Sequence, residues 1–70
     1  MKCYELKSLL AYYHFKADIY KSGKRVLLDL EDNPNAELIL TLLNESGCYY
    51  WRESPQFLPE VFTVEWNLRQ

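Results

Sequence analysis

Apolar and polar residues alternate along two stretches on either side of Ser22 and Gly23, which predicts a β-hairpin. Every second residue is apolar in both stretches: Tyr13, Phe15, Ala17 and Ile19 before the turn, and Val26, Leu28 and Leu30 after it. A period of two residues is typical of strands with one buried face. With Ser22 and Gly23 as a two-residue loop, Ile19 would face Val26, so apolar pairs would share one face of the hairpin.

Helical spacing of apolar residues predicts two helices. Residues 32–47 combine Asn33 as a candidate cap, Pro34 at the first helical position and Gly47 at a left-handed end. The apolar residues that would then pack on a sheet are Leu38, Ile39, Leu42 and Leu43. A further helix within residues 3–13 is predicted from the spacing of Leu6, Leu9, Leu10 and Tyr13, with a strand as the alternative.

Two more strands are predicted after Gly47, over residues 48–53 and 61–68. In the second of these, the apolar members of the alternation are Phe62, Val64, Trp66 and Leu68. Pro55 and Pro59 mark the loop between the two strands. The α-β-β-α-β-β order predicts a small α+β fold with a mainly antiparallel four-stranded sheet, packed on one face by one or two helices.

Size and charge limit the classes of function that fit this chain. Its 70 residues predict a single domain over residues 1–70, and its 49% hydrophobic and 16% aromatic content predicts a folded core. The net charge of −2 disfavours a dedicated binder of nucleic acid or of an anionic membrane. Residues 1–25 hold six Lys or Arg against two acids, whereas residues 26–70 hold two against eight. We therefore expect an electrostatically two-sided molecule, a property that can orient an encounter.

No catalytic group, cofactor site or metal site is predicted. His14, the only histidine, would lie opposite Glu31 as a cross-strand contact rather than act as a general base. The spacing of Cys3 and Cys48 fits no metal site, and we expect both to be reduced thiols in a cytoplasmic protein. The N-terminus lacks the apolar segment of a secretory signal, and no apolar run has the length of a membrane helix, so we expect no membrane association.

An aromatic run at residues 48–52 supplies the candidate functional surface. Neighbouring strand residues point to opposite faces, so Tyr50 and Trp51 must lie on opposite sides of the sheet. We predict Trp51 in the core with Trp66, which leaves Tyr50 and Arg52 on the uncovered face. The alternative buries Tyr50 and exposes Trp51. The predicted partner-binding set adds the hairpin and its basic tip to these two residues: Tyr20, Lys21, Lys24, Arg25, Leu27, Tyr50 and Arg52.

An uncovered sheet face carrying Tyr, Arg and Leu has the composition of protein-binding hot spots. We therefore expect a non-enzymatic interaction protein, either an adaptor or an inhibitor that masks a site on a larger protein. A weak binder of single-stranded nucleic acid is the first alternative, because exposed aromatic rings also stack on bases. A structural homodimer is the second.

Overall fold

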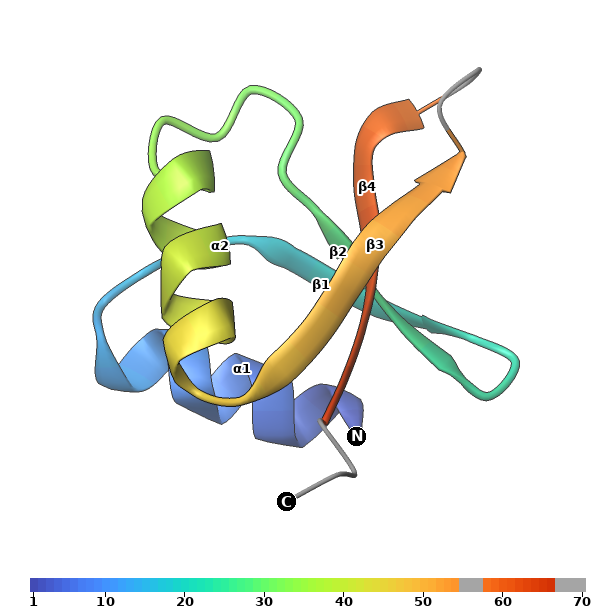
Figure 1. Ribbon diagram of the computed structural model, residues 1–70, viewed down its shortest axis with the longest axis horizontal. Helices are drawn as coiled ribbons and strands as arrows, with labels where there is room; N and C mark the ends of the chain where they lie inside the picture. The colour runs from blue at the N-terminus through green and yellow to red at the C-terminus, as the bar shows by residue number, and fades with distance from the viewer. Residues whose placement is uncertain (55–57, 67–70) are drawn as a thin grey trace.

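The computed structural model describes residues 1–54 and 58–66, in which two helices and four strands are present (Figure 1). In chain order they are α1 (Cys3–Tyr12), β1 (Asp18–Ser22), β2 (Arg25–Asp29), α2 (Ala36–Glu45), β3 (Cys48–Ser54) and β4 (Leu58–Trp66). The predicted α-β-β-α-β-β order is confirmed, and the segment after Lys2 is a helix rather than a strand.

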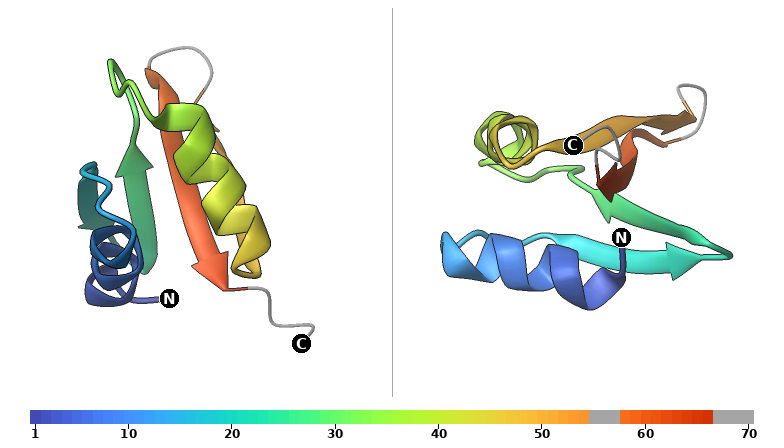
Figure 2. Two further views of the ribbon diagram at one scale, coloured as in Figure 1. Left: turned by 90° about the vertical axis from the view of Figure 1, so that its left-hand side faces the viewer. Right: turned by 60° about the horizontal axis from the view of Figure 1, so that its bottom comes forward.

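The four strands form one antiparallel sheet in the order β1-β2-β4-β3, and both helices cover the same face of it (Figure 2). α1 packs against β1, and α2 packs against β3. Each helix therefore lies over the first strand of the hairpin that follows it, so the helix–hairpin arrangement occurs twice along the chain. The two units meet at the central strands β2 and β4. The predicted α+β class is confirmed.

The core between the helices and the sheet is mostly aliphatic. Its members are Leu6, Leu10, Val26, Leu28, Leu30, Ile39, Leu42, Leu43, Cys48, Phe62 and Val64. The two helices bury equivalent positions, since Leu6 and Ile39, and likewise Leu10 and Leu43, are separated by 33 residues. The prediction that Leu38 also packs on the sheet is wrong. It lies about 100° from Ile39 around the helix, and its side chain is 58% exposed.

The hairpin of β1 and β2 turns one residue later than predicted. Ser22 pairs with Arg25 and Ile19 pairs with Leu28, so the loop consists of Gly23 and Lys24. Gly23 has a φ of 62°, whereas Lys24 is not among the residues of positive φ. A two-residue turn with glycine at its first position and positive φ only there has the type II′ pattern, which matches the twist of the strands. The register shift of two residues keeps the predicted faces unchanged.

His14 ends α1 instead of continuing β1. Its φ is 63°, its backbone N–H donates to the oxygen of Ala11 at 3.0 Å, and the N–H of Phe15 donates to that of Leu10 at 2.9 Å. These two bonds form a Schellman motif, a helix end that requires one left-handed residue. β1 therefore begins at Asp18, and the predicted contact of His14 with Glu31 across the hairpin is wrong. Gly47, 33 residues further on, ends α2 with a φ of 82°, as predicted.

α2 begins at Ala36 rather than at the predicted Pro34, because Asn33 forms a separate turn. Its side-chain Oδ1 accepts a hydrogen bond from the N–H of Asn35 at 2.8 Å, and its Nδ2 donates to the carbonyl oxygen of Lys16 at 2.8 Å. β4 begins at Leu58, so Pro59 belongs to a strand and not to the predicted loop. Pro55, Asn67 and Leu68 lie outside the described residues.

Glu5 joins the first helix to the last strand. Its Oε2 accepts a hydrogen bond from Trp66 Nε1 at 3.1 Å, and its Oε1 accepts one from the backbone N–H of Lys2 at 2.7 Å. The bond from Trp66, followed by that from Lys2, lowers the pKa of the Glu5 carboxyl from its ordinary value of 4.5, because both bonds favour the ionised form.

We expect Gly23→Ala to lower the free energy of unfolding by about 1–2 kcal/mol, because a side chain is strained in the left-handed region. Nothing lies within 4 Å of the added Cβ, so a steric clash would not contribute. Ser22→Ala is the control and should change stability by less than about 0.5 kcal/mol. Urea unfolding measures both. Equal effects would contradict a loop formed by Gly23 and Lys24.

We expect Glu5→Gln to reduce the sensitivity of stability to acid. Because folding lowers the pKa of Glu5, its contribution is present above the unfolded pKa and is lost as the pH falls through the folded pKa. Urea unfolding at about pH 7 and about pH 3 should therefore show a smaller loss for Glu5→Gln than for the wild type. Glu45→Gln, at the exposed end of α2, should keep the wild-type loss. An unchanged loss in Glu5→Gln would exclude this role.

Candidate functional site

The sheet face opposite the helices carries one row of side chains that crosses all four strands. Tyr20 on β1 pairs with Leu27 on β2, Leu27 pairs with Thr63 on β4, and Thr63 pairs with Trp51 on β3. The neighbouring residues Val26, Leu28 and Val64 belong to the helix-covered core. Because strand residues alternate between faces, the row lies on the other side. We call this side, with Tyr49 and Val61 added, the open face.

Aromatic rings occupy the two edges of the open face, and smaller side chains occupy its centre. Tyr20 is 40% exposed on one edge, and Tyr49 and Trp51 are 40% and 44% exposed on the other. Between them Leu27 and Thr63 are buried, as is Val61. The face therefore consists of a closed centre with rings on both sides of it. Rings that are already partly packed lose little conformational freedom when a partner binds.

Charges on the strands of the open face lie toward its ends. Asp18 pairs directly with Asp29, an arrangement in which two like charges destabilise a sheet. Asp29 accepts a hydrogen bond from the N–H of Glu31 at 2.9 Å. At the other end, Glu65 pairs with Tyr49, and Arg25 lies next to the hairpin loop. On this face the carboxylates of Asp18, Asp29 and Glu65 outnumber the guanidinium of Arg25, which makes it acidic.

The predicted places of Tyr50 and Arg52 are wrong, because both lie on the helix side of the sheet. Tyr50 pairs with Val64, and its ring meets that of Phe62 edge to face at 5.9 Å between centroids. The Arg52 guanidinium lies 5.7 Å from the Phe62 ring centroid, within the range of a cation–π contact. The alternative assignment, with Tyr50 inside and Trp51 outside, is therefore the correct one.

Cys48 is the residue from which the facing of β3 could have been predicted. Cysteine is among the residue types most often buried, and Cys48 is a buried member of the core. Tyr50 shares its face because the two residues are two positions apart in a strand. Tyr49 then faces outward with Trp51, although Tyr49 was absent from the predicted set.

The basic hairpin tip is divided between the two sides of the sheet. Arg25 has the same strand parity as Leu27 and belongs to the open face. Lys21 and Lys24 instead line a cleft of about 430 Å³ on the side of the α1 N-terminus, together with Met1, Lys2, Cys3, Gly23 and Val26. Of the predicted set, Tyr20, Arg25 and Leu27 thus share the open face, whereas Lys21 and Lys24 lie apart from it.

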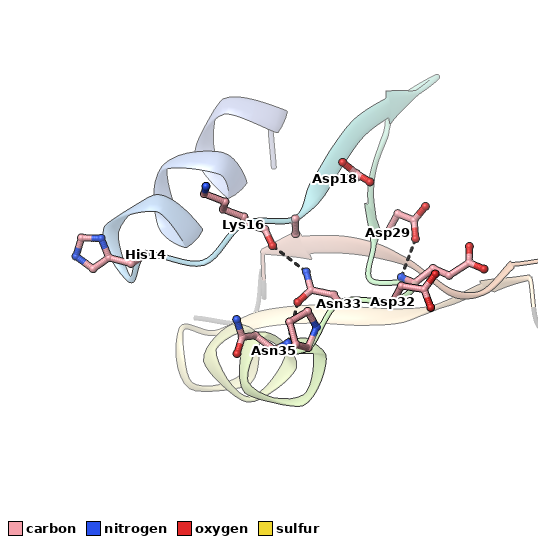
Figure 3. A pocket seen from close by; sticks show the side chains of 10 residues that line it. His14, Lys16, Asp18, Asp29, Asp32, Asn33 and Asn35 are labelled. Carbon is pink, nitrogen blue, oxygen red and sulfur yellow. Dashed lines mark hydrogen bonds between the residues drawn. The ribbon is translucent and has the colours of Figure 1, made fainter.

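A second, polar cleft of 520 Å³ lies where the α1–β1 and β2–α2 connections meet (Figure 3). Asp18, Asp29, Asp32 and Asn33 contribute to its lining. His14 also lines it, but its imidazole points away from Asp29 and Asp32 (Figure 3). Within residues 1–54 and 58–66, no three His, Cys, Asp or Glu side chains are grouped so that they could hold a metal ion.

Both cysteines are free thiols, with Cys3 half-buried and Cys48 buried. Burial raises the pKa of the Cys48 thiol. A thiol with a raised pKa is a poor nucleophile at neutral pH, because only the thiolate attacks. Cys48 therefore acts in the structure as a small apolar core residue.

We expect Tyr50→Ala to lower the free energy of unfolding by about 3 kcal/mol, because it removes a ring packed on the core. Tyr49→Ala removes the same ring from the opposite face and should cost less than about 1 kcal/mol. Urea unfolding of the two variants compares adjacent, chemically identical side chains. A larger loss for Tyr49→Ala would reverse the assignment of the two faces.

The open face holds Tyr20, Tyr49 and Trp51, which are the exposed large hydrophobic side chains among the strand residues whose burial is described, and it is the candidate interaction surface of this protein. The polar cleft, which Asp18 and Asp29 line, and the cleft lined by Lys21 and Lys24 lie at opposite ends of the β1–β2 hairpin. Comparisons with models of protein families, with curated proteins and with solved structures found no match, so the function is inferred from this geometry.

Proposed function

We propose that this protein is a non-enzymatic module that binds a larger protein through the open face, acting as an adaptor or as an inhibitor that masks a site. The observation that carries this proposal is the exposure of Tyr20, Tyr49 and Trp51 on both sides of a closed apolar centre. Protein-binding hot spots are enriched in Trp and Tyr, because each ring buries a large area with few rotatable bonds.

The acidic end of the open face indicates the chemistry of the partner. Asp18 and Asp29 oppose each other across β1 and β2, and a partner that supplies Lys or Arg at this end would relieve their repulsion. The same carboxylates would repel phosphate. The charge of the open face therefore favours a protein partner over single-stranded nucleic acid, although the rings alone would suit either.

We further propose that the protein acts in the cytoplasm. Two unpaired thiols in so small a domain are typical of a reducing compartment. In the described part of the chain, neither helix has the length and apolar character needed to cross a lipid bilayer.

We expect Trp51→Ala to weaken partner binding by about 30-fold or more, the effect of losing a central aromatic anchor. The tagged protein would first be used to capture partners from a nuclease-treated lysate of the native cell. The recovered partner would then be titrated with the wild type and the variants. Tyr12→Ala is the control, because Tyr12 is 77% exposed on α1, away from the open face, and it should bind as the wild type does.

Unchanged binding by a folded Trp51→Ala variant would exclude the open face as the docking surface. Recovery that is lost on nuclease treatment, together with affinity that falls steeply with salt, would instead indicate binding of nucleic acid.

A further inference from the structure

β1 is an edge strand, and among residues 1–54 and 58–66 no other strand lies on its outer side (Figure 2). Four of its five residues are exposed, and it contains neither proline nor a bulge. The other edge, β3, has a register shift between Arg52 and Ser54. A shift of this kind interrupts the regular row of backbone groups that a further strand would need. β1 is therefore the edge better suited to continuing the sheet.

The hairpin register determines which backbone groups of β1 point outward. In a two-residue hairpin, the pair that flanks the loop exchanges backbone hydrogen bonds, and such pairs then alternate along the strands. Counting back from the loop, the residues of β1 that exchange backbone hydrogen bonds with β2 are therefore Ser22, Tyr20 and Asp18. The N–H and C=O groups of Ile19 and Lys21 must then point away from β2, toward the free edge.

We propose that β1 binds β1 of a second copy of this chain in antiparallel orientation, with Tyr20 opposite Tyr20 at the two-fold axis. Ile19 of each copy then lies opposite Lys21 of the other, so all outward backbone groups of these two residues form hydrogen bonds. Asp18 of each copy lies opposite Ser22 of the other. The symmetric contact continues the two sheets as one, which closes at a dimer.

Charge complementarity favours this pairing over binding of an unrelated strand. Each hairpin has an acidic base, where Asp18 pairs with Asp29, and a basic tip, where Lys24 and Arg25 adjoin Ser22. Antiparallel pairing centred on Tyr20 sets the base of one copy against the tip of the other, at both ends of the contact. The strand is thus complementary to itself.

Other registers satisfy fewer of these conditions. Pairing centred on Lys21 would place the two Lys21 residues opposite each other, which is a like-charge pair. Pairing centred on Ile19 would leave Ser22 and the basic tip of each copy beyond the end of β1 in the other. Only the pairing centred on Tyr20 matches all five residues of β1 with all five of its copy.

The dimer does not depend on the proposed function, because it forms through the backbone edge of β1, although the side chains of Tyr20 and Asp18 also belong to the open face. Since a contact of one short strand is small, the association is expected to be weak and dependent on concentration. Light scattering after gel filtration at concentrations up to about 1 mM should show the mass rising from 8.4 kDa toward twice that value. A constant 8.4 kDa across this range would overturn the proposal.

Charge substitutions at Asp18 and Ser22, which lie opposite each other across the proposed dimer, test the register. Ser22→Asp puts a carboxylate opposite Asp18 of the other copy, twice in the dimer, and should weaken self-association roughly tenfold. Within one chain it adds an acid opposite Arg25, so it should not unfold the protein.

Asp18→Lys should also weaken the dimer, although it relieves repulsion from Asp29 within the chain. The double variant Asp18→Lys/Ser22→Asp restores opposite charges and should recover self-association. Failure of the double variant to recover would exclude this register.

Disulfide trapping gives a second test that does not depend on affinity. In a Cys3→Ser background, Tyr20→Cys places two thiols opposite each other at the axis, with Cα atoms about 4.5 Å apart. Ser22→Cys is the control on the same strand and face, because its two copies would lie about 13 Å apart. A mild thiol oxidant such as oxidised glutathione should crosslink Tyr20→Cys much faster than Ser22→Cys. Equal rates would contradict the antiparallel pairing centred on Tyr20.

Discussion

The pairing of β2 with β4 is the contact on which the rest of this structure depends. It joins two helix–hairpin units whose apolar faces meet in one common core. Val26 meets Val64 and Leu28 meets Phe62 on the helix side of this contact. All four residues are in the common core. Helices that face one sheet can share a core only because the central strands bring their hairpins together.

The same pairing explains why the face without helices is still partly closed. Leu27, Val61 and Thr63 lie on the outer side of the central strands and are nonetheless buried. The edge strands place Tyr20 and Trp51 at either end of the row that contains Leu27 and Thr63. Large rings at these positions reduce the exposure of a sheet centre and remain accessible themselves. The proposed binding surface therefore combines a buried centre with exposed rings at both of its edges.

The order of elements could be predicted because its signals are local, whereas register and facing depend on contacts distant in sequence. A shift of two residues in the β1–β2 pairing moves no side chain to the other face, so the apolar pattern fits both registers. The two registers differ in the place of Gly23 in the turn, and its positive φ suits the first position of a two-residue loop. In β3 both faces carry aromatic residues, and the size of Trp51 favoured the wrong one. His14 was misplaced because a helix end that uses histidine in place of glycine has no simple sequence signal.

A dimer through β1 would change what the open face can do. The two open faces would continue across the two-fold axis, with a Tyr20 from each copy at the centre and Trp51 toward each outer edge. A partner with a repeated or symmetric surface could then engage both copies at once. The second contact would form at the high effective concentration set by the first, so modest affinity at each face would give much tighter binding overall. Self-association would thereby select for partners that are themselves symmetric, a selectivity that a single open face does not possess.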